Sequence, residues 1–181
     1  VGSWLVNGLL KENANVTAFV LDTDPNSQLV RSGDFGKISV VNGNLNNYQD
    51  VNRALLTNEC NTVIHLGAQT LVGTAVLDPL STFESNIQGT WNVMEAARQS
   101  NGAVKSVVVA SSDKAYGSSD QLPYLENFPL HGDGPYDVSK SCTDLIAQSY
   151  WSTYGISVTI ARCGNIYGGG DLNWSRIVPG T

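Results

Sequence analysis

The stretch "VKSVVVASSDKAYG", residues 104–117, joins an apolar run to a group of polar side chains. Valines and an alanine lead directly into Ser111, Ser112, Asp113 and Lys114. An apolar run without polar alternation is typical of a parallel strand that is covered on both faces. The sequence therefore predicts a buried strand over 104–110 whose carboxyl end carries hydroxyl, carboxylate and ammonium groups side by side.

Apolar runs of strand length also occur on either side of this stretch, at 15–21, 37–42, 61–67 and 156–161. Segments with a helical pattern alternate with them, at 3–13, 48–58, 82–100 and 136–154. In the third helix the predicted buried stripe consists of Phe83, Ile87, Trp91, Met94 and Ala97. Strands that alternate with helices predict an α/β protein with a Rossmann-type, doubly wound parallel sheet, as one domain over residues 1–181.

The composition narrows the function classes. The chain has 181 residues, is 41% hydrophobic and carries a net charge of −6. An acidic surface repels phosphodiester backbones, so nucleic acid is not an expected partner. We find no apolar stretch long enough to span a membrane and no leader segment, so no membrane association is expected. Cys60, Cys142 and Cys163 have neither metal-type spacing nor a disulfide framework, which favours a cytoplasmic setting.

"YDVSK", residues 136–140, places Tyr136 and Lys140 four residues apart on a predicted helix. Side chains with that spacing share a helix face. A nearby ammonium lowers the pKa of a tyrosine from its usual value near 10, which makes a general base usable near neutral pH. Taken alone, however, the pattern fits a solvated helix face better than a catalytic pair.

A dinucleotide site is indicated by the order of three further features. Gly2 opens a helix, and Asp22 ends the next strand about 20 residues later, the spacing at which an acidic residue binds a ribose and repels a 2′-phosphate. "HLGAQT", residues 65–70, ends another strand in small residues that let a cofactor lie close to the backbone. Ligands of open α/β sheets bind at the carboxyl ends of the strands, so these ends are expected to face one crevice.

Gly2, Asp22, "HLGAQ", "SNIQGTWNVMEAAR", "SSDKAYG", "PYDVSK" and "ARCGNIYGGGD", in this order, resemble the extended short-chain dehydrogenase/reductase family. Within it the chain looks like the nucleotide-sugar 4,6-dehydratases, over essentially its whole length. Ser112-Asp113-Lys114 and "GNIYGGGDLNWSRIVP", residues 164–179, are similar to the CDP-glucose subgroup, whereas the dTDP-glucose and GDP-mannose enzymes carry Thr-Asp-Glu or Ser-x-Glu at the strand end.

The resemblance implies NAD as cofactor and a nucleotide-sugar as substrate, converted from CDP-glucose to CDP-4-keto-6-deoxyglucose for deoxysugar biosynthesis. The residues that it implies at the cofactor are Gly2, Asp22, Asn44, Leu45, Leu66, Ala68, Gln69, Asn86, Tyr136 and Lys140. The implied catalytic residues are Ser112, Asp113, Lys114, Tyr136 and Lys140, and the implied substrate contacts are Ser112, Asn165 and Arg176.

The implied reaction has an oxidation and an elimination. Tyr136 would take the proton of the sugar C4 hydroxyl as hydride leaves C4, with Ser112 bonded to the C4 oxygen and Lys140 to the nicotinamide ribose. Lys114 would then be the base at C5 and Asp113 the acid at the C6 hydroxyl, although coupled groups leave open which one holds the proton. A lysine is a base only when neutral, which desolvation would favour. Alone, Asp113 and Lys114 fit a surface ion pair.

Departures from the family pattern leave alternatives open. Asn44 stands where the family usually has aspartate. Gly2 is the only glycine left of the phosphate loop, so the first strand is expected to be missing from the chain. The C-terminal substrate domain is also expected to be missing. The intact protein is expected to be a homodimer or homotetramer that pairs through helices 82–100 and 136–154. The rival functions are a 4-epimerase or decarboxylase of the same superfamily and a non-catalytic fragment.

Overall fold

The computed structural model describes residues 1–171, 173–174 and 176–181. The chain divides into two units, which are described separately. The first unit comprises Val1–Val41 and Asn165–Thr181, and the second comprises Asn42–Gly164.

The first unit contains α1 (Gly2–Lys11), β1 (Thr17–Val20), α2 (Gln28–Arg31), the 3₁₀ turn η1 (Asp34–Lys37) and β2 (Ser39–Asn42), which ends at the unit boundary. β1 and β2 form a two-stranded sheet. Asn7 of α1 is buried and donates hydrogen bonds to Ser32 Oγ at 3.1 Å and to Asp34 Oδ2. The indole of Trp4 donates to the carbonyl oxygen of Gly169 at 2.7 Å, so α1 also holds the segment that follows the second unit.

The second unit contains a parallel sheet in the order β3-β4-β5, formed by Thr62–His65, Ser106–Ser112 and Val158–Cys163. In its register Val109 lies beside both His65 and Ile160, and Ser112 lies beside Cys163. Its helical segments are α3 (Tyr48–Thr57), α4 (Val72–Leu77), α5 (Pro79–Phe83), η2 (Glu84–Gln88), α6 (Gly89–Gln99), η3 (Asp113–Tyr116) and α7 (Pro135–Tyr154).

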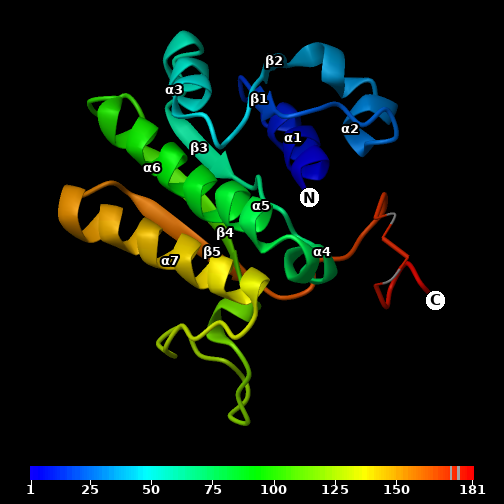
Figure 1. The fold of residues 1–181 in the computed structure, drawn as a ribbon. Coiled ribbons are helices and arrows are strands. Elements are labelled where there is room, and N and C mark those ends of the chain that lie inside the picture. The colour runs from blue at the N-terminus through cyan, green and yellow to red at the C-terminus, as the bar shows by residue number, and fades with distance from the viewer. Residues whose placement is uncertain (172, 175) are drawn as a thin grey trace. The chain divides into compact units, whose positions relative to one another are not determined.

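The core of the second unit lies between the sheet and two long helices. Val107 and Val109, at alternate positions of β4, are fully buried and pack with Met94 of α6 and Ala147 of α7. Figure 1 shows α6 and α7 side by side, with β4 and β5 beside them. Because strand side chains alternate between faces, Ser111 continues the buried face of Val107 and Val109, while Ser112 belongs to the opposite face.

The predicted α/β class with parallel strands is confirmed, and the predicted helix 136–154 agrees with α7 within one residue. Strand β4 runs later than predicted, from Ser106 to Ser112, so both serines belong to the strand itself. The strands form two sheets, since β1 and β3 do not pair in the described part of the chain. Among the described residues we find no helix that is long and apolar enough to cross a membrane.

The predicted helix over 82–100 contains a π turn that the sequence pattern did not predict. The structure has α5, then the π-helical turn η2 over Glu84–Gln88, and then α6. A π turn contains an extra residue and therefore rotates the helix that follows. Met94 and Ala97 are buried as predicted, but Trp91 is 46% exposed, so the predicted stripe does not continue through it.

Candidate active site

The carboxyl end of β4 turns sharply because Ser112 caps the 3₁₀ turn η3. Its Oγ accepts a hydrogen bond from the backbone N–H of Lys114 at 3.2 Å and donates to Asp113 Oδ1 at 3.0 Å. A serine at an N-cap satisfies a backbone donor that the turn would otherwise leave without a partner. Ser112 is buried to 9% exposure, so its hydroxyl is held at a defined place at the edge of the sheet.

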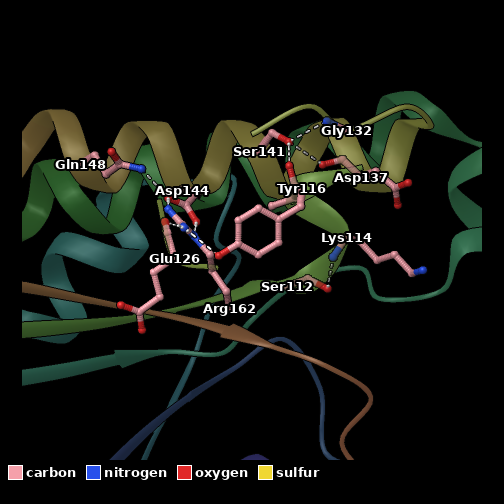
Figure 2. A network of polar contacts seen from close by, with 11 residues as sticks. Ser112, Lys114, Tyr116, Glu126, Gly132, Asp137, Ser141, Asp144, Gln148 and Arg162 are labelled. Carbon is pink, nitrogen blue, oxygen red and sulfur yellow. Dashed lines mark hydrogen bonds and ion pairs between the residues drawn. The ribbon is translucent and has the colours of Figure 1, made fainter. Parts of the chain in front are cut away.

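Asp113 and Lys114 begin η3 and differ in their surroundings. Asp113 is half-buried and bonded to Ser112, whereas Lys114 is exposed. Figure 2 shows the Lys114 side chain extending away from Ser112. The expected desolvation of Lys114 is therefore absent from this structure, because a single turn at the surface of the unit does not cover a long side chain.

Tyr136 and Lys140 lie on the first turns of α7, which begins with Pro135 at a position where a missing N–H costs nothing. Both side chains are buried, Lys140 to 5% exposure. The ammonium of Lys140 donates to the carbonyl oxygen of Ala110 at 3.0 Å, which attaches α7 to β4 two residues before Ser112. Burial lowers the pKa of Lys140 to about 8, because desolvation disfavours the charged form, while Cys163 acts in the opposite direction.

Asn86 joins the loop after β3 to α7. Its side chain is 1% exposed, accepts from the backbone N–H of Gln69 at 2.7 Å, and donates to Gln69 O and Ser139 Oγ, both at 2.9 Å. An asparagine is a poor residue for a helix interior, and here it lies in the π turn η2. Asn86 therefore holds the loop that contains Leu66, Ala68 and Gln69 rather than stabilising a regular helix.

Leu45 packs under the same loop. A Cβ atom on Gly67 would lie 2.5 Å from Leu45 Cδ1, and the carbonyl oxygen of Leu45 accepts from Asn92 Nδ2 at 2.7 Å. Asn44 is exposed, and its Oδ1 accepts from the backbone N–H of Asn46 at 2.9 Å. Part of the acceptor capacity that Asn44 could offer to a cofactor is therefore used inside its own turn.

The other predicted site residues belong to the first unit. Gly2 begins α1, Asp22 is exposed after β1, and Asn165 is exposed. Arg176 pairs with Asp171 at 3.2 Å. The structure thus brings together Ser112, Asp113, Tyr136 and Lys140, with the loop held by Asn86, in one unit.

His65, at the end of β3, is buried against Thr90 of α6. It is 7% exposed, and its Nε2 lies 3.1 Å from Thr90 Oγ1. Burial, with a smaller contribution from the charge of Lys140, lowers the pKa of His65 to about 4, so this imidazole is neutral near pH 7.

The sequence analysis missed two features beside η3. Arg162 on β5 forms an ion pair with the fully buried Asp144 of α7, with Nε 2.6 Å from Asp144 Oδ2 (Figure 2). Asp137, next to Tyr136, has a pKa raised by burial, and the ammonium of Lys114 opposes this rise. Asp144 follows Lys140 by one helical turn, and that spacing is the only signal that could have pointed to it.

A parallel α/β sheet whose strand end carries a capped serine, beside a helix with Tyr136 and Lys140, defines a protein of the short-chain dehydrogenase/reductase class. Within that class the chain belongs to the family described as GDP-mannose 4,6 dehydratase, whose pattern matches residues 1–173.

The proteins to which the chain is similar are named for different reactions. The chain is 30% identical over 191 residues to the CDP-glucose 4,6-dehydratase of Salmonella typhimurium, across 98% of this chain and 52% of that protein. The dTDP-glucose 4,6-dehydratase of Streptomyces venezuelae, solved with NAD bound, is similar with a TM-score of 0.86 and 28% identity, over 98% of this chain and 56% of that one. The UDP-glucose 4-epimerase of Thermus thermophilus, solved in complex with NAD, is similar with a TM-score of 0.80 and 28% identity, over 92% of this chain and 52% of that one. The chain thus spans about half the length of the relatives it matches.

Proposed function

We propose that residues 1–181 are the NAD-binding part of a nucleotide-sugar 4,6-dehydratase that acts on CDP-glucose. The observation that carries this proposal is the position of Ser112, Asp113 and Lys114 directly at the end of β4, in the unit where α7 buries Tyr136 and Lys140. The NAD-bound relatives and the CDP-glucose enzyme of Salmonella support it.

The residues of the second unit fit a dinucleotide. The loop after β3 has small residues at Gly67 and Ala68, and Asn86 holds its backbone at Gln69. Lys140 supplies a buried ammonium close to the sheet edge, suited to a ribose hydroxyl. In the first unit, Asp22 would bind the adenosine ribose and Gly2 would lie at the phosphates. NAD, when bound, accepts a hydride and returns it, so it is not consumed.

In the oxidation, Tyr136 takes the proton of the C4 hydroxyl while Lys140 favours the phenolate. The hydroxyl of Ser112, which donates to Asp113 Oδ1 in this structure, turns and donates its one hydrogen to the C4 oxygen as that oxygen becomes a carbonyl. A carbonyl at C4 makes the C5 proton acidic and prepares the sugar for loss of water.

In the elimination, Lys114 takes the C5 proton and Asp113 gives a proton to the departing C6 hydroxyl. The bound sugar would cover Lys114 and supply the desolvation that the exposed side chain lacks. Asp113, already bonded to Ser112, is oriented toward the same edge of the sheet. Asn165 and Arg176 would contact the substrate.

The test is an assay for the alkali-induced absorbance of a 4-keto-6-deoxy sugar, with CDP-glucose, dTDP-glucose, GDP-mannose and UDP-glucose offered separately to the purified protein. We expect product with CDP-glucose. Product from another nucleotide-sugar alone would correct the substrate but keep the reaction class.

A second candidate is a 4-epimerase, which the similarity to the Thermus enzyme supports. An epimerase shares the oxidation at C4 but needs no acid and base beside Ser112. If the protein converts a nucleotide-sugar to its C4 epimer without forming a 6-deoxy product, the dehydratase proposal is wrong.

We propose further that the protein is a homodimer or homotetramer that pairs through α6 and α7. Trp91 on α6 and Leu145 on α7 are 46% and 54% exposed, so each of these helices offers a large apolar side chain to a partner. Light scattering on the Trp91→Glu/Leu145→Glu variant should give a monomer mass, and an unchanged oligomer would contradict this pairing.

A further inference from the structure

Arg162 connects three segments that surround the end of β4. Its Nε and Nη2 donate to Asp144 Oδ2 and Oδ1 at 2.6 and 3.0 Å. Its Nη1 donates to the hydroxyl of Tyr116 at 2.9 Å and to the carbonyl oxygen of Glu126 at 2.6 Å. One guanidinium on β5 thus holds α7, the last residue of η3 and the loop that follows η3 (Figure 2).

The geometry suits an arginine and no other residue. Asp144 is 0% exposed, and its Oδ1 also accepts from Gln148 Nε2 at 2.6 Å. The flat guanidinium fork matches both carboxylate oxygens and has donors left for Tyr116 and Glu126, whereas a lysine ammonium is a single point charge. A buried pair of this kind contributes little net stability compared with an apolar pair, but it defines orientation.

The segment that Arg162 holds is the one that begins with Asp113 and Lys114. The guanidinium lies 5.1 Å from the centre of the Tyr116 ring, and that ring stacks on Tyr124 at 5.0 Å. On the other side, Ser141 Oγ of α7 donates to the carbonyl oxygen of Ala115 at 2.9 Å. A cavity of about 420 Å³ is lined by Arg162 and Asp113 together.

Tyr136 and Lys140 precede Asp144 on α7, and Lys140 also contacts the sheet without Arg162. Lys140 has its own bond to Ala110 in β4, and both side chains are buried on α7. Arg162 therefore contacts the far end of η3 at Tyr116, whereas Lys140 contacts β4 directly at Ala110.

We propose that Arg162 is a positioning residue that sets the place of Asp113 and Lys114 relative to Tyr136, and that it controls the elimination of water but not the oxidation at C4. This inference rests on the proposed dehydratase function. Arg162 touches neither the reacting carbon atoms nor the cofactor in this role; it acts through Tyr116 and the turn η3.

The test compares Arg162→Lys with Arg98→Lys in the purified protein. Arg98 is a matched control, because it also forms a two-bond pair, with Glu95 at 2.8 and 2.6 Å, and lies over a tyrosine ring, that of Tyr154, at 5.2 Å. Arg162→Lys should slow release of the 4-keto-6-deoxy product on the order of 10²-fold, the size expected for a misplacement of about 1 Å. The rate of reduced nicotinamide formation in a single turnover should stay unchanged, so reduced cofactor should accumulate. Arg98→Lys should change neither rate.

Tyr116→Phe removes only the hydroxyl that Arg162 holds. It should slow product release by a smaller factor than Arg162→Lys does, again without a change in the rate of reduced nicotinamide formation. An equal fall of oxidation and elimination in Arg162→Lys, with wild-type folding by circular dichroism, would overturn the inference, and so would full elimination activity.

Hydrogen exchange keeps this inference separate from the proposed function. Exchange of the amides over 113–131 should be faster in Arg162→Lys than in wild type, while the amides of α7 from 136 to 140 should keep their rates. If the wild-type protein dehydrates no nucleotide-sugar, the proposed function fails. If exchange of the amides over 113–131 is the same in Arg162→Lys as in wild type, the positioning role of Arg162 is wrong.

Discussion

At the scale of single residues, burial decides which of the polar groups around β4 are poised for chemistry. Lys140 is buried and its pKa falls to about 8, whereas the Lys114 side chain is exposed. Two lysines of the same sequence thus differ because one lies against the sheet and the other on a surface turn. Both roles can be tested by single substitutions.

Lys114→Ala should stop water loss and spare the oxidation at C4, because Tyr136, Lys140 and Ser112 are untouched. The measurement is the absorbance of reduced nicotinamide together with the keto-sugar assay. Dehydration at the normal rate in this variant would place the C5 base elsewhere, with Asp137 the next group to test.

Lys140→Met should remove a pH dependence of stability. The folded protein disfavours the ammonium, so its pKa of about 8 lies below the ordinary value of 10.5. Between these values the unfolded chain binds the extra proton, and stability rises with pH wherever that is so. The penalty from Lys140 is therefore complete below about pH 8 and disappears by about pH 10.5. The free energy of unfolding of wild type, minus that of Lys140→Met, should rise across this window, and a flat difference would contradict the burial of the ammonium.

At the scale of elements, the short turn η3 depends on the residues at its two ends. Ser112 caps its start, and Gly117 ends it with φ +70° and ψ −162°, a conformation that is essentially restricted to glycine. A Cβ atom at Gly117 would also collide with the carbonyl oxygen of His131. The end of β4, the turn η3 and the loop at His131 therefore pack closely together around Gly117.

Gly117→Ala should destabilise the protein by more than Gly102→Ala. Gly102 also has a positive φ, of +83°, but a Cβ there meets nothing within 4 Å, so this control carries the backbone cost alone, about 1–2 kcal/mol. Urea unfolding of both variants measures the difference. If both variants lose the same free energy of unfolding, the loop at His131 moves away from the new Cβ atom without an energetic cost.

At the scale of the molecule, the second unit carries the packed core, and its stability should follow the contact between the helices and β4. Met94, Val107 and Val109 are all fully buried there. This core keeps α7 against the sheet and so keeps Tyr136 beside the end of β4.

Met94→Ala should cost about 2–5 kcal/mol, because it leaves a cavity among rigid neighbours. Leu77→Ala is the control, since Leu77 is 87% exposed. Hydrogen exchange of the β4 amides reports the loss, and protection that is equal in the two variants would show that α6 does not support the sheet.

Local patterns in the sequence were sufficient for the α/β class, the parallel strands and the helix that carries Tyr136 and Lys140. Apolar runs and helical spacing report burial within a few residues, and helix α7 and strand β4 follow them closely. The π turn within the helix over 82–100 could not be predicted from local spacing, and Asn86 in this turn bonds to Gln69 and Ser139, which lie far away in the sequence.

The sequence by itself determined that Ser112, Asp113 and Lys114 follow a buried strand, and that Tyr136 and Lys140 share one helix face. Only the tertiary structure decided how Asp113 and Lys114 are held. The register of β4 and β5 places Arg162 beside Ser111, and α7 brings Asp144 to meet it. A contact between residues on different elements depends on strand register and helix packing, which no local pattern encodes.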